Sequence, residues 1–447
     1  MLFTSSVDCL LFCHPKELSS IARETKFIQR KRKLDINTFL QLLFAEPGKI
    51  AESSLTHLCA KLAKPSLTLS KQALDKRFNE HAVQFMERIF LRLFESQSKL
   101  AFSKLPIATT YPFRSMRILD GSSVKLPDAL HVMFPGTTGA GVKCQLEFDY
   151  LTGKFCYVEL QPGKAGDSLS GLSRLENVQK DDLLLQDLGY FKCDLFREIE
   201  QKEAFYVSRA RADTMFYVDS PHPRYHKNGE IMKKYAHIRL FLEEEIQTMK
   251  PGESREFPRV YIGKHERMPS RLVIYRMTAE EQKRQEFRIK RRKQTKPGKI
   301  KQKVKDLSGI SIYVTNLPAE IPASEICSLY RYRWQIELLF KSWKSDLGVA
   351  RYRNMKAERW LCHLYAELII FLLSVLLTYQ IRHYFWKEKQ LILSERIGIR
   401  EVSERVWKLW QARASPKWRE VMDELLNILA SNGPKNVKKP GPIHWLT

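Results

Sequence analysis

The stretch at residues 329–348 reads LYRYRWQIELLFKSWKSDLG and decides how the fold is interpreted. Wound at about 100° per residue, it places a group of apolar and aromatic side chains on one flank of a helix. That flank carries Tyr332, Ile336, Leu339, Phe340, Trp343 and Leu347. Within about 60° of arc, the other face carries Tyr330, Arg333, Glu337 and Lys344. We therefore predict a helix that packs on one side and presents a lone carboxylate among cations on the other.

Two interpretations of this polar face are open. An exposed amphipathic helix would use the acid in ion pairs with cations three or four residues away. A functional helix would use the carboxylate to bind a metal ion and the flanking groups to bind phosphates. Lys341 lies beside the row in the projection, so one acid faces four basic or phenolic groups. This imbalance favours the functional interpretation.

The charge of the chain indicates a polyanionic partner. Its 447 residues contain 75 Lys and Arg against 50 Asp and Glu, a formal net charge of +25. Nucleic acid is the first candidate for such a surface and an anionic membrane is the second. Residues 288–305 include ten basic side chains and no acidic one. That segment is either a solvated loop or an arm that follows phosphates, and both interpretations are open.

Cysteine usage and hydropathy indicate a cytoplasmic protein without a membrane span. The eight cysteines form no CxxC pair, and the cluster of Cys9, Cys13 and His14 lacks the second ligand pair of a zinc site. The apolar run 361–379 is long enough to cross a bilayer, but His363 and Glu367 interrupt it. We predict that this run is a buried core helix.

Hydrophobic periodicity divides the chain into five regions. Residues 1–105 are predicted to be a helical DNA-binding region. Residues 106–210 and 309–380 are the two parts of a mixed α/β core. Between them, 211–308 form a β-rich insertion with the basic segment, and 381–447 form a helical C-terminal region.

Within the N-terminal region, two short helices are predicted at 52–63 and 71–80, with Ser70 as the cap of the second. They form either an ordinary helical hairpin or a helix-turn-helix. In a helix-turn-helix, the side chains that face DNA would be Lys71, Gln72, Lys76 and Arg77.

Two aspartates are the best partners for the helix carboxylate. Asp120 and Asp187 each end a predicted apolar strand and are followed closely by glycine, which leaves room for close backbone approach. Metal-dependent cleavage of a phosphodiester needs several acids, which hold cations about 3.5 to 4 Å apart. Asp before Gly is also common in turns, so a turn interpretation is open for both. The competing acids are Glu147, Asp149, Glu159, Asp181 and Asp182.

The spacing Tyr330-x2-Arg333-x3-Glu337-x6-Lys344 resembles the YREK signature of bacterial insertion-sequence-four family transposases, which are DDE transposases. Asp120 in ILDGS and Asp187 in LLLQDLGY match the first and second catalytic aspartates of that family, and Glu337 matches the glutamate. The order of the helical region, the two aspartates, the insertion and the glutamate helix extends the resemblance over nearly the whole chain.

This resemblance implies a ribonuclease-H-like mixed-sheet core interrupted by a β-rich insertion. It implies that Asp120, Asp187 and Glu337 are the catalytic residues and the ligands of two Mg²⁺ ions, for which Mn²⁺ can substitute. It also implies that Tyr330, Arg333 and Lys344 bind DNA phosphates. Lys341 is added to the DNA-binding residues from the helical projection alone.

The implied activity is cut-and-paste DNA transposition. The protein would bind terminal inverted repeats of double-stranded DNA, cleave the transposon ends and join the 3′-hydroxyls to target DNA. It would act on the bacterial nucleoid in the cytoplasm, as a homodimer in the paired-end complex. A nuclease without strand transfer and a domesticated DNA-binding protein are the alternatives. The presence of all three acids argues against the second alternative.

One feature departs from relatives that cut through a DNA hairpin and use a tryptophan wedge in the insertion. All eight tryptophans of this chain lie at position 334 or later. Because stacking on a base requires only a π face, another aromatic residue can take this role. The candidates in the insertion are Phe216, Tyr217 and Tyr225.

Overall fold

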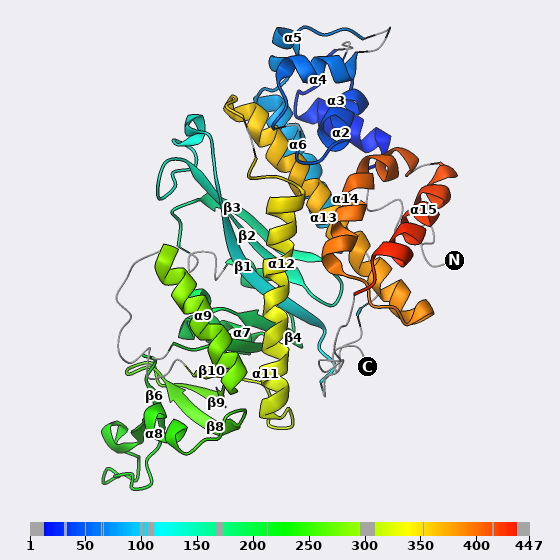
Figure 1. The fold of residues 1–447 in the computed structure, drawn as a ribbon. Helices are drawn as coiled ribbons and strands as arrows, with labels where there is room; N and C mark the ends of the chain where they lie inside the picture. The colour runs from blue at the N-terminus through cyan, green and yellow to red at the C-terminus, as the bar shows by residue number, and fades with distance from the viewer. Residues whose placement is uncertain are drawn as a thin grey trace. The chain divides into compact units, whose positions relative to one another are not determined.

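The fold is taken from a computed structural model of the chain (Figure 1). The structure describes residues 13–30, 34–49, 51–63, 65, 67–98, 102, 104–105, 111–166, 173–211, 213–295, 309–351, 353–413 and 415–435. Its contacts define two compact units. Unit 1 comprises Met1–Ala108, Gly121–Gly166 and Gln335–Thr447, and unit 2 comprises Thr109–Asp120 and Asp167–Trp334.

The N-terminal part of unit 1 is helical, as predicted. Its helices are α2 (Pro15–Glu24), α3 (Ile36–Phe44), α4 (Leu55–Leu62), α5 (Lys71–Asp75) and α6 (Glu80–Ser98). The Ser70 side chain accepts a hydrogen bond from the Ala73 amide at 3.2 Å, so the predicted cap is confirmed. Helix α5 is shorter than predicted because Asn79 caps a new helix, with its side chain accepting from the Ala82 amide at 3.0 Å.

The C-terminal part of unit 1 is also helical. It contains α12 (Gln335–Lys341), α13 (Ala357–Lys389), α14 (Glu395–Ala412) and α15 (Lys417–Asn432). Helix α13 packs against α6 and α14 (Figure 1). Among the described residues it is the one helix long and apolar enough to cross a membrane, and 94% of its most apolar window is buried inside the structure. The prediction of a buried core helix is confirmed.

The strands form one mixed sheet in the order β3-β2-β1-β4-β5-β10-β9-β8-β6-β7. Their bounds are β1 (Ser115–Lys125), β2 (Gly141–Asp149), β3 (Phe155–Pro162), β4 (Asp182–Gln186), β5 (Phe205–Arg209), β6 (Phe216–Asp219), β7 (His237–Leu240), β8 (Ser254–Ile262), β9 (Met268–Arg276) and β10 (Ile310–Thr315). Strand β4 is parallel to β1 and to β5, whereas β10 is antiparallel to β5 and β9. The mixed sheet confirms the predicted α/β class with a mixed-sheet core.

The β-rich insertion is confirmed, and its strands continue the core sheet of unit 2. Strand β9 pairs with β10 along its length, and β8, β6 and β7 follow outward. Apolar side chains of the insertion, including Val260, Leu272 and Ile274, belong to the same buried cluster as Leu184 and Tyr206 of the core strands. Shared burial of this kind explains why the insertion packs as part of unit 2.

Among the described residues, three α-helices of unit 2 precede β10. They are α7 (Cys193–Gln201), α8 (Leu242–Gln247) and α9 (Ala279–Thr295). Helix α9 includes the start of the basic segment, so a loop is wrong for 288–295, and 296–308 lie outside the described residues. A short 3-10 helix, Ser173–Asn177, precedes β4.

Candidate active site

Asp120 and Asp187 lie at matching positions on neighbouring parallel strands. The prediction that Asp120 ends its strand is wrong, because β1 continues to Lys125. The register of β1 and β4 pairs Arg117 with Leu184 and Ile118 with Leu185. Two residues further along the same register, Asp120 of β1 faces Asp187, which directly follows β4 in extended conformation. Adjacent strands lie about 4.8 Å apart. The two carboxylates that the sequence selected separately are therefore neighbours.

Two side chains from one turn of helix contact these two aspartates. The Arg333 guanidinium lies 3.7 Å from Oδ2 of Asp120, and the Tyr330 hydroxyl donates a long hydrogen bond of 3.4 Å to Oδ1 of Asp187. The side chains are three residues apart, and that spacing brings them to the same side of a helix. One helical turn therefore contacts both aspartates. Neither motif shows this relationship in the sequence.

Electrostatics explain the arrangement around the aspartates. Two carboxylates on adjacent strands repel one another, and the Arg333 charge beside Asp120 offsets that repulsion. Burial raises the pKa of Tyr330, and the negative charge of Asp187 raises it further. The phenol therefore stays protonated and can only donate toward the carboxylate.

The helix that carries the signature is less regular than the projection assumed. It consists of α11 (Ala323–Arg331), a 3-10 turn (Tyr332–Trp334), α12 and a π-helical turn (Ser342–Asp346). The predicted packing flank is confirmed, because all six of its apolar and aromatic side chains are buried. Tyr330 is buried as well, with its ring centroid 5.0 Å from that of Tyr313 on β10. The polar face is therefore not one exposed row.

The remaining signature residues belong to unit 1. Glu337 is half-buried in α12, four residues after Arg333. Lys344 lies in the π-helical turn, where its Nζ donates to the Ser123 carbonyl oxygen at 2.7 Å. Lys341 is exposed at the end of α12. π-Helical turns occur frequently at functional sites, which makes this irregularity at Lys344 informative.

Most of the competing acids stabilise local structure. Buried Asp182 receives hydrogen bonds from Arg114, Ser115 and the Gln179 amide. Three others also accept local hydrogen bonds: Asp149 from Leu151 and Thr152, Asp181 from Tyr111, and Glu159 from Tyr157 and Gln161. Glu147 is fully buried in β2. Asp120 and Asp187 are thus the acids whose positions best suit chemistry.

The donor set suits a hard divalent cation. Carboxylate oxygens are the ligands that Mg²⁺ and Mn²⁺ prefer, and the Asp120 side chain keeps 26% of its surface exposed. Within the described ranges, no group of three or more His, Cys, Asp and Glu side chains is gathered closely enough to hold a metal. The assignment of Glu337 as a third ligand consequently depends on the signature spacing.

The N-terminal helices present fewer DNA-facing groups than predicted. Lys71, Gln72 and Lys76 are exposed on and just after α5. Arg77 is buried, with its guanidinium 4.8 Å from the ring centroid of Phe27. Its predicted contact with DNA is therefore wrong, since stacking on an aromatic ring holds its charge inside the helical region.

The three aromatic candidates of the insertion differ in exposure. Phe216 is buried in the core, and Tyr217 is covered by Arg267, whose guanidinium lies 3.2 Å from the ring centroid. Tyr225 is 56% exposed, in a bridge with Ile231. Only Tyr225 of these three offers an accessible π face.

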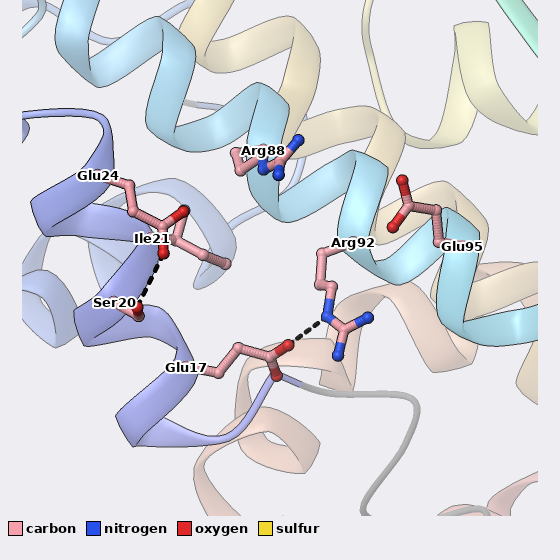
Figure 2. A pocket seen from close by; sticks show the side chains of 7 residues that line it. All are labelled: Glu17, Ser20, Ile21, Glu24, Arg88, Arg92 and Glu95. Atoms are coloured by element: carbon pink, nitrogen blue, oxygen red, sulfur yellow. Dashed lines mark hydrogen bonds and ion pairs between the residues drawn. The ribbon is translucent and has the colours of Figure 1, made fainter.

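A pocket of about 270 Å³ lies elsewhere, between α2 and α6 of unit 1 (Figure 2). Its acids are engaged locally: Glu17 pairs with Arg92, and Glu24 accepts a hydrogen bond from Ser20 at 2.8 Å. The Glu17–Arg92 pair fastens α2 to α6, and the Ser20–Glu24 bond lies within α2. The pocket therefore contributes to the helical scaffold and not to the candidate chemistry.

Paired aspartates on adjacent parallel strands, with an arginine and a tyrosine directed at them in a strongly basic α/β protein, are the arrangement expected of a metal-dependent nucleic-acid enzyme. The family model described as the transposase DDE domain matches residues 111–373. The chain belongs to this family, and it is a metal-dependent DNA transposase.

Individual relatives agree with this family. The transposase for insertion sequence element IS231E of Bacillus thuringiensis subsp. finitimus is 34% identical over 431 residues, 94% of this chain and 90% of that protein. The transposase for IS1151 of Clostridium perfringens is 33% identical over 372 residues, covering 80% and 77% respectively. Among solved structures, the piggyBac transposase synaptic complex with hairpin DNA is similar with a TM-score of 0.44 and 12% identity, covering 99% of this chain and 87% of that chain.

Proposed function

We propose that this transposase binds the terminal inverted repeats of its own element, cleaves the ends and joins the freed 3′-hydroxyls to target DNA. The observation that carries the proposal is the pairing of Asp120 with Asp187 on adjacent parallel strands, contacted by Arg333 and Tyr330. Such a pair of carboxylates, accessible and balanced by one cation, is what a site for metal-assisted phosphodiester cleavage requires.

Each residue has a distinct role in this proposal. Asp120, Asp187 and Glu337 hold two Mg²⁺ ions, for which Mn²⁺ can substitute. When bound, these ions supply Lewis-acid activation of the attacking oxygen and stabilise the leaving oxygen. Tyr330 orients Asp187 through its hydroxyl, and its contact with phosphate follows only in the DNA complex.

The basic side chains of the signature helix bind the DNA end. Arg333 balances Asp120 in the free protein and binds a phosphate once the carboxylates bind metal. Lys344 and Lys341 bind phosphates further along the same strand, because charge-assisted hydrogen bonds to phosphate oxygens fix DNA in register. The exposed lysines of α5 bind the terminal repeat more distantly.

The partners follow from the reaction. The protein contacts two DNA molecules, the transposon end and the target, and acts on the bacterial nucleoid in the cytoplasm. We propose a homodimer in the paired-end complex, since two ends must be cut and joined together.

Incubation of the purified protein with duplexes copied from its own element ends and Mg²⁺ tests the proposal. Nicks at the end and products joined to a target plasmid are expected. Glu337→Gln should abolish both while leaving end binding within about twofold, because the amide cannot serve as an anionic metal ligand. Unchanged cleavage by Glu337→Gln would overturn the metal assignment. Nicks without joined products would favour a nuclease without strand transfer.

A further inference from the structure

Two glycines of unit 1, far apart in the sequence, touch backbone to backbone. Gly48 and Gly348 both have positive φ, +75° and +71°. A Cβ added to Gly48 would lie 2.5 Å from the Leu347 carbonyl oxygen, and one added to Gly348 would lie 3.1 Å from Cα of Gly48. No other residue type fits this contact without displacement.

A fully buried acid closes the contact. The amide of Gly48, which lies in a loop, donates a hydrogen bond of 2.8 Å to Oε1 of Glu367 within α13. His363, one turn earlier, has its Nδ1 3.9 Å from the same oxygen. Burial raises the pKa of Glu367 to about 8, although the Gly48 hydrogen bond opposes this rise. Glu367 is therefore neutral and serves as an acceptor. It is one of the two residues that interrupt the apolar run of the sequence.

The segment 347–359, which we name the clamp segment, continues from this contact to the N-terminal helices. The Arg353 amide donates to the Ala51 carbonyl at 2.9 Å. Arg359, itself buried, donates to the Ser53 carbonyl at 2.7 Å, next to the cap of α4. Lys356 lies 3.3 Å from Oδ2 of Asp75 at the end of α5.

At its other end the clamp segment holds the π-helical turn that carries Lys344. The Leu347 amide donates to Ser342 at 3.1 Å, and an Arg351 Nη2 donates to the Ser345 carbonyl at 2.8 Å. Asp346 is held from α14 by two hydrogen bonds from Arg396, at 3.0 and 3.2 Å. The Leu347-to-Ser342 hydrogen bond spans five residues and belongs to the π-helical turn itself, whereas Arg351 and Arg396 hold the turn from outside it.

We propose that the clamp segment is a positioning device for Lys344, with the Gly48–Gly348 contact and Glu367 as its fixed point. It fastens the π-helical turn to α4 and α5. The helices that contact the terminal repeat therefore also fix the position of Lys344, which binds the phosphate at the transposon end. This inference rests on the proposed function for the role of Lys344 and of α5, but the contacts themselves do not.

The test compares the salt dependence of end binding among variants. A neutralised phosphate contributes about one unit to the slope of log Kobs against log salt. With a labelled duplex copied from the element's terminal repeat, Lys344→Ala is expected to lower the slope by about one. Gly348→Ala should lower it equally, and the double variant should lower it no further. Where Lys344→Ala lowers the slope, two results would overturn the proposal. One is a wild-type slope in Gly348→Ala, and the other is a loss in the double variant equal to the sum of the two single losses.

A control separates the contact from backbone strain. Gly252 also has positive φ, +84°, but a Cβ there meets only Thr278 Cγ2 at an ordinary 3.6 Å. Gly252→Ala is expected to keep the wild-type slope. Thermal unfolding of each variant verifies that it is folded before binding is measured.

A second measurement needs no DNA and keeps the inference separate from the proposed function. Hydrogen exchange at 342–346 should accelerate in Glu367→Leu, which removes the acceptor for Gly48, and stay slow in Glu367→Gln, which keeps a neutral acceptor. Equal protection in both variants would overturn the clamp. A different outcome is an unchanged salt slope in Lys344→Ala together with faster hydrogen exchange at 342–346 in Glu367→Leu. That result would exclude the phosphate contact of Lys344, and the clamp segment would still hold the π-helical turn.

Discussion

The hydroxyl of Tyr330 lies 3.4 Å from Oδ1 of Asp187 in this structure. The ring is buried against Tyr313, and both burial and the neighbouring carboxylate raise the pKa of the phenol. A residue whose spacing suggests a phosphate contact is therefore directed at a carboxylate that we propose to be catalytic. Partners of metal ligands orient them and tune their basicity, which gives Tyr330 a role before DNA arrives.

Tyr330→Phe should lower end cleavage by about tenfold, because the loss of an orienting partner typically costs 10- to 100-fold in activity or metal affinity. The measurement is the rate of end nicking across a Mg²⁺ titration, with the apparent metal affinity expected to weaken. Tyr313→Phe is the matched control, since its ring is adjacent and has no proposed role in catalysis. Identical Mg²⁺ profiles for Tyr330→Phe and wild type would contradict the orienting role.

Arg333→Ala should weaken end binding and lower its salt slope by about one, as loss of one phosphate contact does. The guanidinium lies only 3.7 Å from Asp120, so its removal also takes away one positive charge that offsets the aspartate pair. Arg331→Ala is the control, because Arg331 is exposed and faces Glu281 at 3.8 Å. A slope in Arg333→Ala equal to that of the control would show that Arg333 neutralises no phosphate.

Tyr225→Ala should weaken binding of the transposon end by about 1 to 3 kcal/mol, the usual effect of removing one aromatic stacking partner. Tyr225→Phe should bind as the wild type does, since stacking needs the ring and not the hydroxyl. Fluorescence of 2-aminopurine placed at the end of the duplex reports the unstacked base directly. Wild-type affinity in Tyr225→Ala would exclude this residue as the wedge.

Glu367 and His363 predict opposite effects of pH on stability. Burial raises the pKa of Glu367 to about 8 and lowers the pKa of His363 to about 3. Above the usual pKa of a carboxyl group, Glu367 keeps its proton in the folded protein but loses it in the unfolded chain. Its contribution to the free energy of unfolding therefore falls as pH rises toward 8. The buried imidazole has the reverse effect, and that effect is complete above its unfolded pKa of about 6.5.

Of these two groups, only Glu367 still changes the free energy of unfolding between pH 6.5 and 8. The stability of Glu367→Gln relative to wild type should therefore increase by up to about 1.4 kcal/mol per pH unit across this interval. Urea unfolding at pH 6.5 and pH 8 measures the difference, and His363→Gln, which removes the other titration, should leave the wild-type slope in place. Parallel pH profiles for Glu367→Gln and wild type would mean that Glu367 is already ionised in the folded protein.

Much of the fold was predictable because its signals are local. The hairpin of β2 and β3, the Ser70 cap and the six buried residues of the signature helix follow from periodicity and turn chemistry over a few residues. Local signals were wrong where a neighbour intervened. The buried position of Arg77 depends on Phe27, about fifty residues earlier, and the end of α5 depends on the Asn79 cap of the next helix.

The sequence by itself determined the family, the two candidate aspartates and the spacing of the signature helix, because each is a pattern of residue types at fixed separations. Only the tertiary structure decided that Asp120 and Asp187 are in register, since parallel pairing joins strands that are more than sixty residues apart. It also decided what Tyr330, Arg333 and Glu367 touch. Their partners lie far along the chain, and packing brings them together at distances that no local pattern encodes.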